Sequence, residues 1–97
     1  MPKLRFTKIA KEDLEILQTN HAKKKVLKAV YKTLAFMQEN LRHPSLNAHE
    51  FRRLKGPNGE KVFEVYAQQN TPGAYRILWY YGPEKGIISI IGIVPHP

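Results

Sequence analysis

The sequence predicts an α+β domain with an N-terminal strand, a helical hairpin and then a curved antiparallel sheet of three to four strands. Two observations lead to this prediction. Apolar residues recur at helical spacing in the first half of the chain, whereas Gly- and Pro-containing turns divide the second half into short runs rich in β-branched and aromatic residues. With 97 residues the chain has room for a single domain, which we place at residues 1–97.

The first elements are a short strand and two helices. Residues 4–9 alternate apolar and polar side chains, which is typical of a strand with one buried face. Glu12, Asp13 and Glu15 then place carboxylates in what we expect to be the first turn of a helix, where the helix dipole favours negative charge. A second, longer helix is expected to span residues 21–39.

The longer helix is amphipathic. Apolar side chains spaced by three or four residues form its buried stripe, which consists of Val26, Val30, Leu34 and Met37. At about 100° per residue, three basic side chains fall together on the opposite face. They are Lys25, Lys28 and Lys32. We therefore expect the stripe to pack on the sheet and the lysines to face solvent.

Turn residues divide the second half into strands. Pro44 ends the helical region because it lacks a backbone N–H and disfavours helical geometry just before it. The Asn58-Gly59 pair supplies the positive φ that a tight hairpin turn demands. Strands are expected at residues 51–54, 61–67, 75–81 and 87–94. The last of these runs is apolar on both faces, so we expect it in the middle of the sheet.

Composition restricts the classes of function. Sixteen Lys and Arg against eight Asp and Glu give a net charge of +8, which favours polyanionic partners such as nucleic acid or an acidic protein. There is no cysteine, so a disulfide framework, a thiolate zinc site and a cysteine nucleophile are excluded. No stretch approaches the roughly 18 consecutive apolar residues of a membrane span, and the N-terminus lacks the apolar core of a signal peptide. We expect a cytoplasmic protein without membrane contact.

Three short motifs, in this order and spacing, resemble the RelE/ParE superfamily of toxins from bacterial type II toxin–antitoxin pairs. They are Leu54-Lys55-Gly56 before the hairpin turn, Tyr75-Arg76-Ile77-Leu78 at the start of a strand, and Ile93-Val94-Pro95-His96 after the last strand. The resemblance covers nearly the whole chain in topology. In pattern it is similar to RelE-like mRNA interferases with a C-terminal His, such as the YoeB and YafQ types.

The resemblance implies a RelE-like fold and a toxin that inhibits translation by cutting mRNA on the ribosome. It also implies an acidic antitoxin as partner, in a toxin–antitoxin hetero-oligomer. ParE-like members share the fold but inhibit gyrase without nuclease activity, so gyrase inhibition is the alternative function. A basic binding module with no toxin role is a third interpretation.

Metal-free RNA cleavage, in which the 2′-hydroxyl attacks the adjacent phosphate, needs three kinds of group. A base takes the hydroxyl proton, cations stabilise the charge on the phosphorane, and an acid protonates the leaving oxygen. His21, His43 and His49 show no metal-ligand spacing, so neither a metal nor another cofactor is expected. Such a site would use His, Glu, Lys, Arg and Tyr.

Arg76 and His96 are the first candidates for catalysis. Arg76 lies in mid-strand, where its guanidinium can bind two phosphate oxygens, and it matches the position at which RelE-like toxins carry a catalytic arginine. Its alternative is an exposed ion pair with Glu64. His96 has the side chain best suited to move a proton near pH 7, and it resembles the terminal His of several RelE-like nucleases. Its alternative is a frayed chain end.

The basic cluster before the hairpin turn consists of Arg52, Arg53 and Lys55. In RelE-like toxins this region supplies a base or the cations that hold the RNA backbone, so we expect Arg52 in the catalytic set and the other two as RNA-binding residues. Arg52 stands where YoeB-like members carry a carboxylate and YafQ-like members a His. The nearby Glu50 and His49 are therefore candidate general bases. The alternative for the cluster is a charged, solvated hairpin edge.

Aromatic and lysine side chains complete the expected RNA-binding surface. Tyr80 shares a strand face with Arg76, so we expect it to stack on a base. Trp79 and Tyr81 lie on the opposite face and are expected to pack under the helices. The three lysines of the long helix are expected to contact phosphates, their alternative being a solubilising surface.

Overall fold

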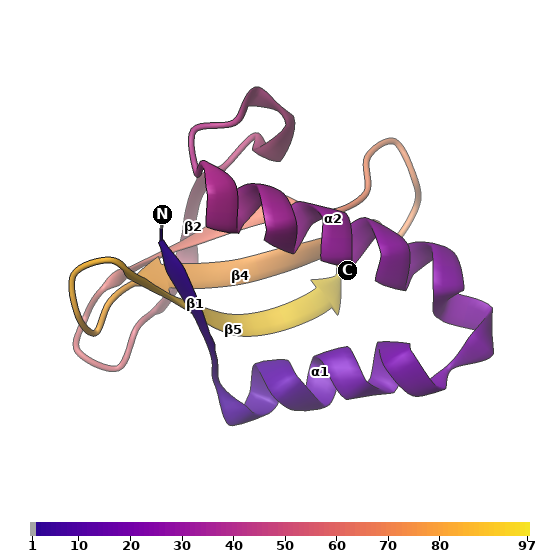
Figure 1. Cartoon of the computed structure of the whole chain (residues 1–97), viewed down its shortest axis with the longest axis horizontal. Helices are drawn as coiled ribbons and strands as arrows, with labels where there is room; N and C mark the ends of the chain where they lie inside the picture. Colours follow the sequence, from indigo (N-terminus) through magenta and orange to yellow (C-terminus); the bar gives the residue numbers. More distant parts are fainter. Residues whose placement is uncertain (1) are drawn as a thin grey trace.

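The computed structural model describes residues 2–97, which form one five-stranded sheet with both helices packed on one face (Figure 1). The strands are β1 (Lys3–Phe6), β2 (His49–Lys55), β3 (Lys61–Tyr66), β4 (Tyr75–Tyr81) and β5 (Ile87–Pro95). The helices are α1 (Lys8–Thr19) and α2 (Lys24–Glu39), with short 3-10 turns η1 (His21–Lys23) and η2 (Pro44–Leu46). The predicted α+β class and order of elements are confirmed.

The sheet has the strand order β1-β5-β4-β3-β2. Strands β2 to β5 form an antiparallel meander, and β5 lies between β4 and β1, as its two apolar faces predict. β1 joins the other edge of β5 in parallel, with Lys3 opposite Ile87 and Phe6 opposite Ile90. Between these two paired strands the chain passes through both helices and the other three strands.

The start of α1 differs from the prediction. The helix begins at Lys8, because the Thr7 side chain accepts a hydrogen bond from the Ala10 backbone N–H at 3.3 Å and so caps the helix. The first strand therefore ends at Phe6, and there is no acidic residue in the first turn. Asp13 is used differently: its carboxylate accepts a hydrogen bond from the Ile93 backbone N–H at 2.9 Å and ties α1 to β5.

The main core lies between the helices and the sheet. The predicted stripe of α2 is buried, and Val30 and Met37 are 0% exposed. It packs with residues of β4 and β5 such as Ile77, Trp79 and Ile90, while the three lysines of the opposite face of α2 are exposed. The predicted helical phase is therefore correct. Among residues 2–97 no helix is both long enough and apolar enough to cross a membrane.

The other face of the sheet is not covered by a helix, and its centre is closed by its own side chains. Val62, Leu78 and Tyr80 are buried there, with Phe51 of β2 packed against them. Polar side chains occupy the same face toward the start of β4 and the end of β5. We call this the open face of the sheet.

Candidate active site

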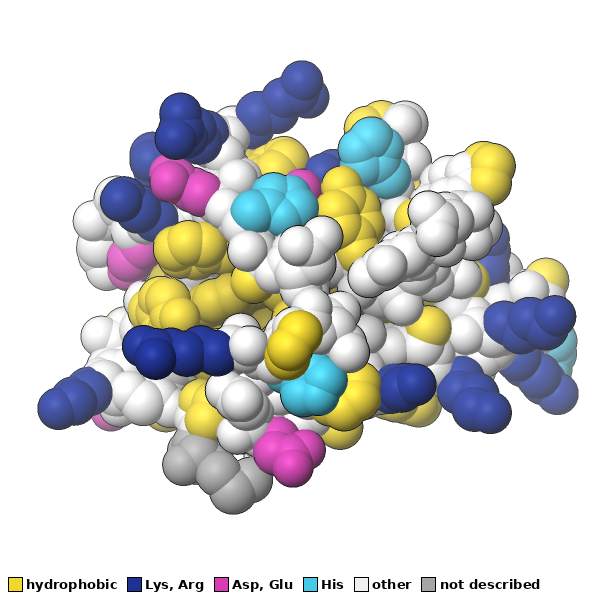
Figure 2. Space-filling view, turned by 90° about the horizontal axis from the view of Figure 1, so that it is seen from above, with side chains coloured by type: hydrophobic (Ala, Val, Ile, Leu, Met, Phe, Trp, Pro, Cys, Tyr) yellow, Lys and Arg dark blue, Asp and Glu magenta, His cyan; other side chains and the backbone are white. Residues whose placement is uncertain are grey.

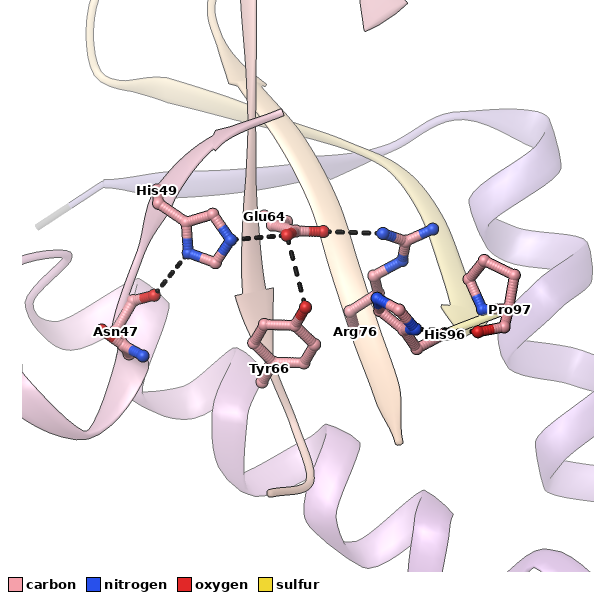
Figure 3. Close-up of polar contacts among 7 residues, drawn as sticks. All are labelled: Asn47, His49, Glu64, Tyr66, Arg76, His96 and Pro97. Carbon is pink, nitrogen blue, oxygen red and sulfur yellow. Dashed lines mark hydrogen bonds and ion pairs between the residues drawn. The ribbon is translucent and has the colours of Figure 1, made fainter. Parts of the chain in front are cut away.

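A buried carboxylate is at the centre of a polar cluster on the open face (Figure 3). Glu64 of β3 has a side chain that is only 7% exposed. One of its oxygens lies 2.5 Å from Nε2 of His49, and the other accepts a hydrogen bond from Nη1 of Arg76 at 2.8 Å. The Tyr66 hydroxyl donates to the first oxygen at 3.5 Å. Glu64 is therefore the residue that joins the cluster.

The sheet register brings these residues together. His49 of β2 is directly opposite Glu64 in the antiparallel pair, and Arg76 of β4 is opposite Tyr66. Side chains at i and i+2 of a strand share a face, so Glu64 and Tyr66 point the same way. Strand β2 begins at His49, two residues before the predicted start, and this extension completes the cluster.

Arg76 is held by two neighbouring side chains. Its side chain is 11% exposed, it is paired with Glu64, and its guanidinium carbon lies 4.8 Å from the centre of the Phe51 ring. The ion pair considered from the sequence is present, but it is buried rather than exposed. Among residues 2–97 the Arg76 Nε atom is buried without a hydrogen-bond partner, so the guanidinium keeps an unused donor.

His49 has an oxygen atom beside each ring nitrogen. Nδ1 lies 3.1 Å from the Asn47 carbonyl oxygen, and Nε2 faces the Glu64 carboxylate. Both oxygens are acceptors, so a hydrogen bond to each of them requires a proton on each ring nitrogen. The His49 side chain is 47% exposed, which makes it the accessible end of the cluster. Arg76 supplies the cation that faces the carboxylate on the other side.

Tyr66 and His96 extend the cluster toward the end of β5. The Tyr66 ring centre lies 5.8 Å from that of His49 and 6.3 Å from that of His96. The His96 backbone N–H donates to the Ala74 carbonyl at 2.9 Å, so the residue after β5 is held against the sheet. The imidazole itself is exposed, with Nδ1 2.9 Å from the Pro97 carbonyl oxygen. His96 thus has one ring nitrogen free for a ligand.

The basic cluster of β2 lies apart from this site. Glu50 is paired with Phe63, whose side chain packs in the helix-side core, so Glu50 points away from the open face. Arg52 is 87% exposed, with Nε 3.9 Å from the Glu50 carboxylate. Lys55 lies at 3.9 Å from the same carboxylate, and Arg53 is exposed. The structure thus joins His49 to Arg76 but leaves Glu50 and Arg52 elsewhere.

The aromatic residues of β4 follow the predicted alternation, with two differences in exposure. Tyr80 shares the face of Arg76, but it is 2% exposed and its hydroxyl accepts a hydrogen bond from Arg5 at 2.9 Å. In this conformation its ring is closed to a stacking base. Trp79 is buried under the helices, as predicted. Tyr81 is 55% exposed because it lies at the strand end, with an edge-on contact to Trp79 instead of a helix above it.

Much of the positive charge lies at the edges of the molecule (Figure 2), in addition to Arg76 within the candidate site. Figure 2 shows Lys and Arg side chains, in dark blue, around the rim of the molecule, while histidine, apolar and uncharged side chains occupy much of the middle of the view. Lys25, Lys28 and Lys32 of α2 are exposed. Within residues 2–97 no group of three His, Asp or Glu side chains is placed to hold a metal ion.

Sequence reasoning gave Glu64 only the role of a surface partner and did not select Tyr66. A signal for both was present in β3. Phe63, Val65 and Ala67 face the helices, so alternation places Glu64 and Tyr66 on the open face. A carboxylate in the middle of such a strand needs a partner, and the neighbouring strand offers Arg76.

The fold and its open face define a class: an α+β domain of the RelE-like type, with the polar cluster on the face that the helices leave uncovered. Neither a protein-family model nor a curated protein matches the sequence. Solved structures do match along the whole chain, and they include a YoeB/ParE toxin and RelE toxins.

Three of these structures illustrate the similarity. A metal-bound toxin from Helicobacter pylori is 18% identical, with a TM-score of 0.70 over 99% of this chain and 96% of that chain. A YoeB/ParE toxin from Agrobacterium tumefaciens is 14% identical, with a TM-score of 0.69 over 98% and 99% of the two chains. The intact RelBE toxin–antitoxin complex from E. coli gives 15% identity and a TM-score of 0.63 over 100% and 99%. The chain therefore has the fold of these toxins.

Proposed function

We propose that this protein is the toxin of a type II toxin–antitoxin pair and that it cleaves mRNA on the ribosome by metal-free acid–base chemistry. The observation that supports this proposal is the cluster on the open face. It combines a carboxylate, a guanidinium and two histidines, which are the kinds of group that attack by a 2′-hydroxyl requires.

Arg76 binds the phosphate in this proposal. A phosphodiester carries one negative charge, which the Arg76 guanidinium can pair. The guanidinium has donors beyond the one given to Glu64. When the phosphate takes over the bond from Nη1, Arg76 stabilises the phosphorane and one oxygen of Glu64 becomes free.

Glu64, supported by His49, is the proposed base. The oxygen released by Arg76 accepts the 2′-hydroxyl proton, and the other stays bound to the His49 ring. This proposal chooses His49 over Glu50 for the base region, because Glu50 lies on the other face of β2. A base in this position typically contributes about 10²–10⁴-fold to the rate.

His96 is the proposed acid for the 5′-oxygen leaving group. It is exposed, it lies on the far side of Tyr66 from His49, and its backbone is fixed by the bond to Ala74. The His49 end of the cluster, which holds the proposed base, and His96, the proposed acid, are thus separated by Tyr66 (Figure 3). Arg53, Lys55 and the lysines of α2 serve as phosphate contacts away from the chemistry.

The test is primer extension on message from cells that express each variant. Arg76→Lys, Glu64→Gln and His96→Gln should each lower cleavage by about 10²-fold or more. Arg52→Gln should weaken RNA binding in a salt-dependent way with a smaller effect on cleavage under saturating conditions, because Arg52 is outside the cluster. Lys11→Gln, an exposed change on α1, is the matched control.

Two results would contradict the proposal. Cleavage at wild-type rates by all three cluster variants, with folding verified by circular dichroism, would exclude this site. A wild-type protein that leaves message intact but blocks DNA supercoiling would instead support the ParE-like function. Protein synthesis and supercoiling should therefore be measured in parallel in the same cells.

The proposed partner is an acidic antitoxin, since the chain carries a net charge of +8 and the E. coli structure named above is a complex of toxin and antitoxin. Such a pair acts in the cytoplasm, where the ribosome is. An acidic reading frame beside this one should relieve growth inhibition on co-expression and raise the melting temperature of the toxin by mass action. Growth inhibition that no neighbouring acidic protein relieves would contradict the assignment.

A further inference from the structure

A cavity adjoins the candidate active site and is not used by the chemistry proposed above. It has a volume of about 310 Å³ and lies between α2, η2 and the end of β3. Tyr66 forms part of its wall. Because the Tyr66 hydroxyl also contacts Glu64 at 3.5 Å, the same residue belongs to the cavity wall and to the polar cluster.

The lining combines a flat aromatic surface with polar groups. Phe36 is stacked on His43, with ring centres 4.4 Å apart and an angle of 17° between the planes. The Lys32 ammonium lies 5.9 Å from the centre of the Phe36 ring, at the exposed side of α2. Ser45 and Gln69 add a hydroxyl and a carboxamide, which can both donate and accept hydrogen bonds.

The size and chemistry of the cavity fit one nucleobase. Its volume is at the lower end of the range of small-molecule pockets, roughly 300–1,000 Å³, so it is too small for an oligonucleotide. An aromatic wall suits stacking, the amide and hydroxyl suit the hydrogen-bonding edge of a base, and the lysine suits the attached phosphate. These three kinds of group occur together in the same cavity.

We propose that this cavity binds the base of the nucleotide next to the cleaved phosphate and that Gln69 and Ser45 select which base enters. The face of Phe36 that His43 leaves open provides the stacking surface, and the Lys32 ammonium moves from above this ring to bind the flanking phosphate. The inference rests on the proposed function, since it assumes that RNA reaches Glu64 and Arg76. It adds a site of nucleotide preference, separate from the residues that perform the cleavage.

Binding of uncleavable RNA tests the cavity directly. The probes are four 2′-O-methyl trinucleotides that differ only in the central base, titrated into the isotope-labelled protein and followed by NMR. Signals of Ser45, Gln69 and Phe36 should shift, and the dissociation constants should differ by about fivefold or more between the best and worst base. Stacking of one base contributes roughly five- to hundredfold to affinity.

Two substitutions on α2 make a matched pair. Ala29 lines the cavity, so Ala29→Met should fill it and remove the differences among the four probes, whereas Ala35→Met adds the same atoms at an exposed position and should change nothing. Gln69→Ala removes the amide without adding volume. It should reduce the preference among bases, and it replaces Ala29→Met if that variant does not fold.

The outcomes separate the two proposals. If message is cleaved but the four probes bind equally, or if the preference survives in both Ala29→Met and Gln69→Ala, the base cavity is wrong and the nuclease stands. If the preference is lost in these variants but the wild type cleaves no message, the cavity stands and the nuclease is wrong. Absence of any shift in the cavity signals with all four probes would overturn the inference.

Discussion

Removal of the carboxylate at the centre of the cluster should destabilise the whole domain. In Glu64→Leu, the Arg76 guanidinium keeps its charge at 11% exposure with no partner, and His49 and Tyr66 lose their acceptor. Breaking a buried ion pair from one side costs about 3–5 kcal/mol. A domain of this size has a free energy of unfolding of about 5–15 kcal/mol, so the variant should still fold but with a large loss of stability.

Unfolding in urea, followed by circular dichroism, measures this loss. With a slope of about 1.5 kcal/mol per M, the midpoint of Glu64→Leu should fall by about 2–3 M. Adding Arg76→Met to the same protein removes the unpaired charge and should recover much of the loss, because apolar replacement of a buried pair is often close to neutral. The double-mutant cycle should therefore give a coupling energy of about 2–3 kcal/mol.

An exposed pair on β2 provides the control. Lys55 and Glu50 are separated by 3.9 Å and are 55% and 26% exposed, so Glu50→Leu should change stability through this pair by less than about 1 kcal/mol. A coupling energy below about 0.5 kcal/mol for Glu64 and Arg76 would refute the reasoning. The pair would then contribute little to stability, and the loss of function in Arg76 variants could be assigned to chemistry alone.

Four further changes test other parts of the structure. Asp13→Ala should cost about 1–3 kcal/mol in urea unfolding, since it leaves the Ile93 N–H without its acceptor; an unchanged midpoint would contradict this. Val30→Asp buries a charge at 0% exposure and should abolish the cooperative thermal transition seen by circular dichroism. His96→Gln should leave the urea midpoint unchanged while cleavage falls, because its ring is exposed. Backbone N–H groups of the hairpin turn lower the pKa of Glu60. The contribution of this carboxylate to the free energy of unfolding is therefore present above the unfolded-state pKa and is lost as pH falls through the folded-state pKa. The stability difference between wild type and Glu60→Gln should shrink over that acid range.

The sequence was sufficient to predict the order of elements and the phase of α2. Val30 and Met37 are spaced so that they share one helix face. Asn58-Gly59 marks the turn between β2 and β3 through its local conformational preference alone. The predicted start of α1 was wrong for a physical reason. Asp13 suggested a first turn by its charge, but its partner is the Ile93 backbone, 80 residues further on. Local patterns do not report such a contact.

The candidate site was predicted in part. Arg76 could be selected because a charge in mid-strand needs a partner or a function. The residue of β2 that pairs with Glu64 could not be predicted, because the pairing of β2 with β3 shifts register between Glu50 and Lys55. Counting back from the Lys55 and Lys61 pair without that shift would place Arg52 opposite Glu64. The irregularity puts His49 there instead, and a sequence gives no reliable measure of such a shift.

The parallel pairing of β1 with β5 has a consequence for the order of folding. The Arg5 and Ser89 side chains that bond across this pair are 84 residues apart, and contacts of such long range form slowly. Since β5 lies between β1 and β4, β1 has no partner strand and β4 has only β3 until β5 has been made. Chains are synthesised from the N-terminus at about 5–20 residues per second, so β1 and the helical hairpin wait several seconds, and β4 about 1–3 seconds, for the strand that completes their core. A nascent chain therefore cannot present the assembled site to the ribosome that is making it before synthesis has passed Pro95.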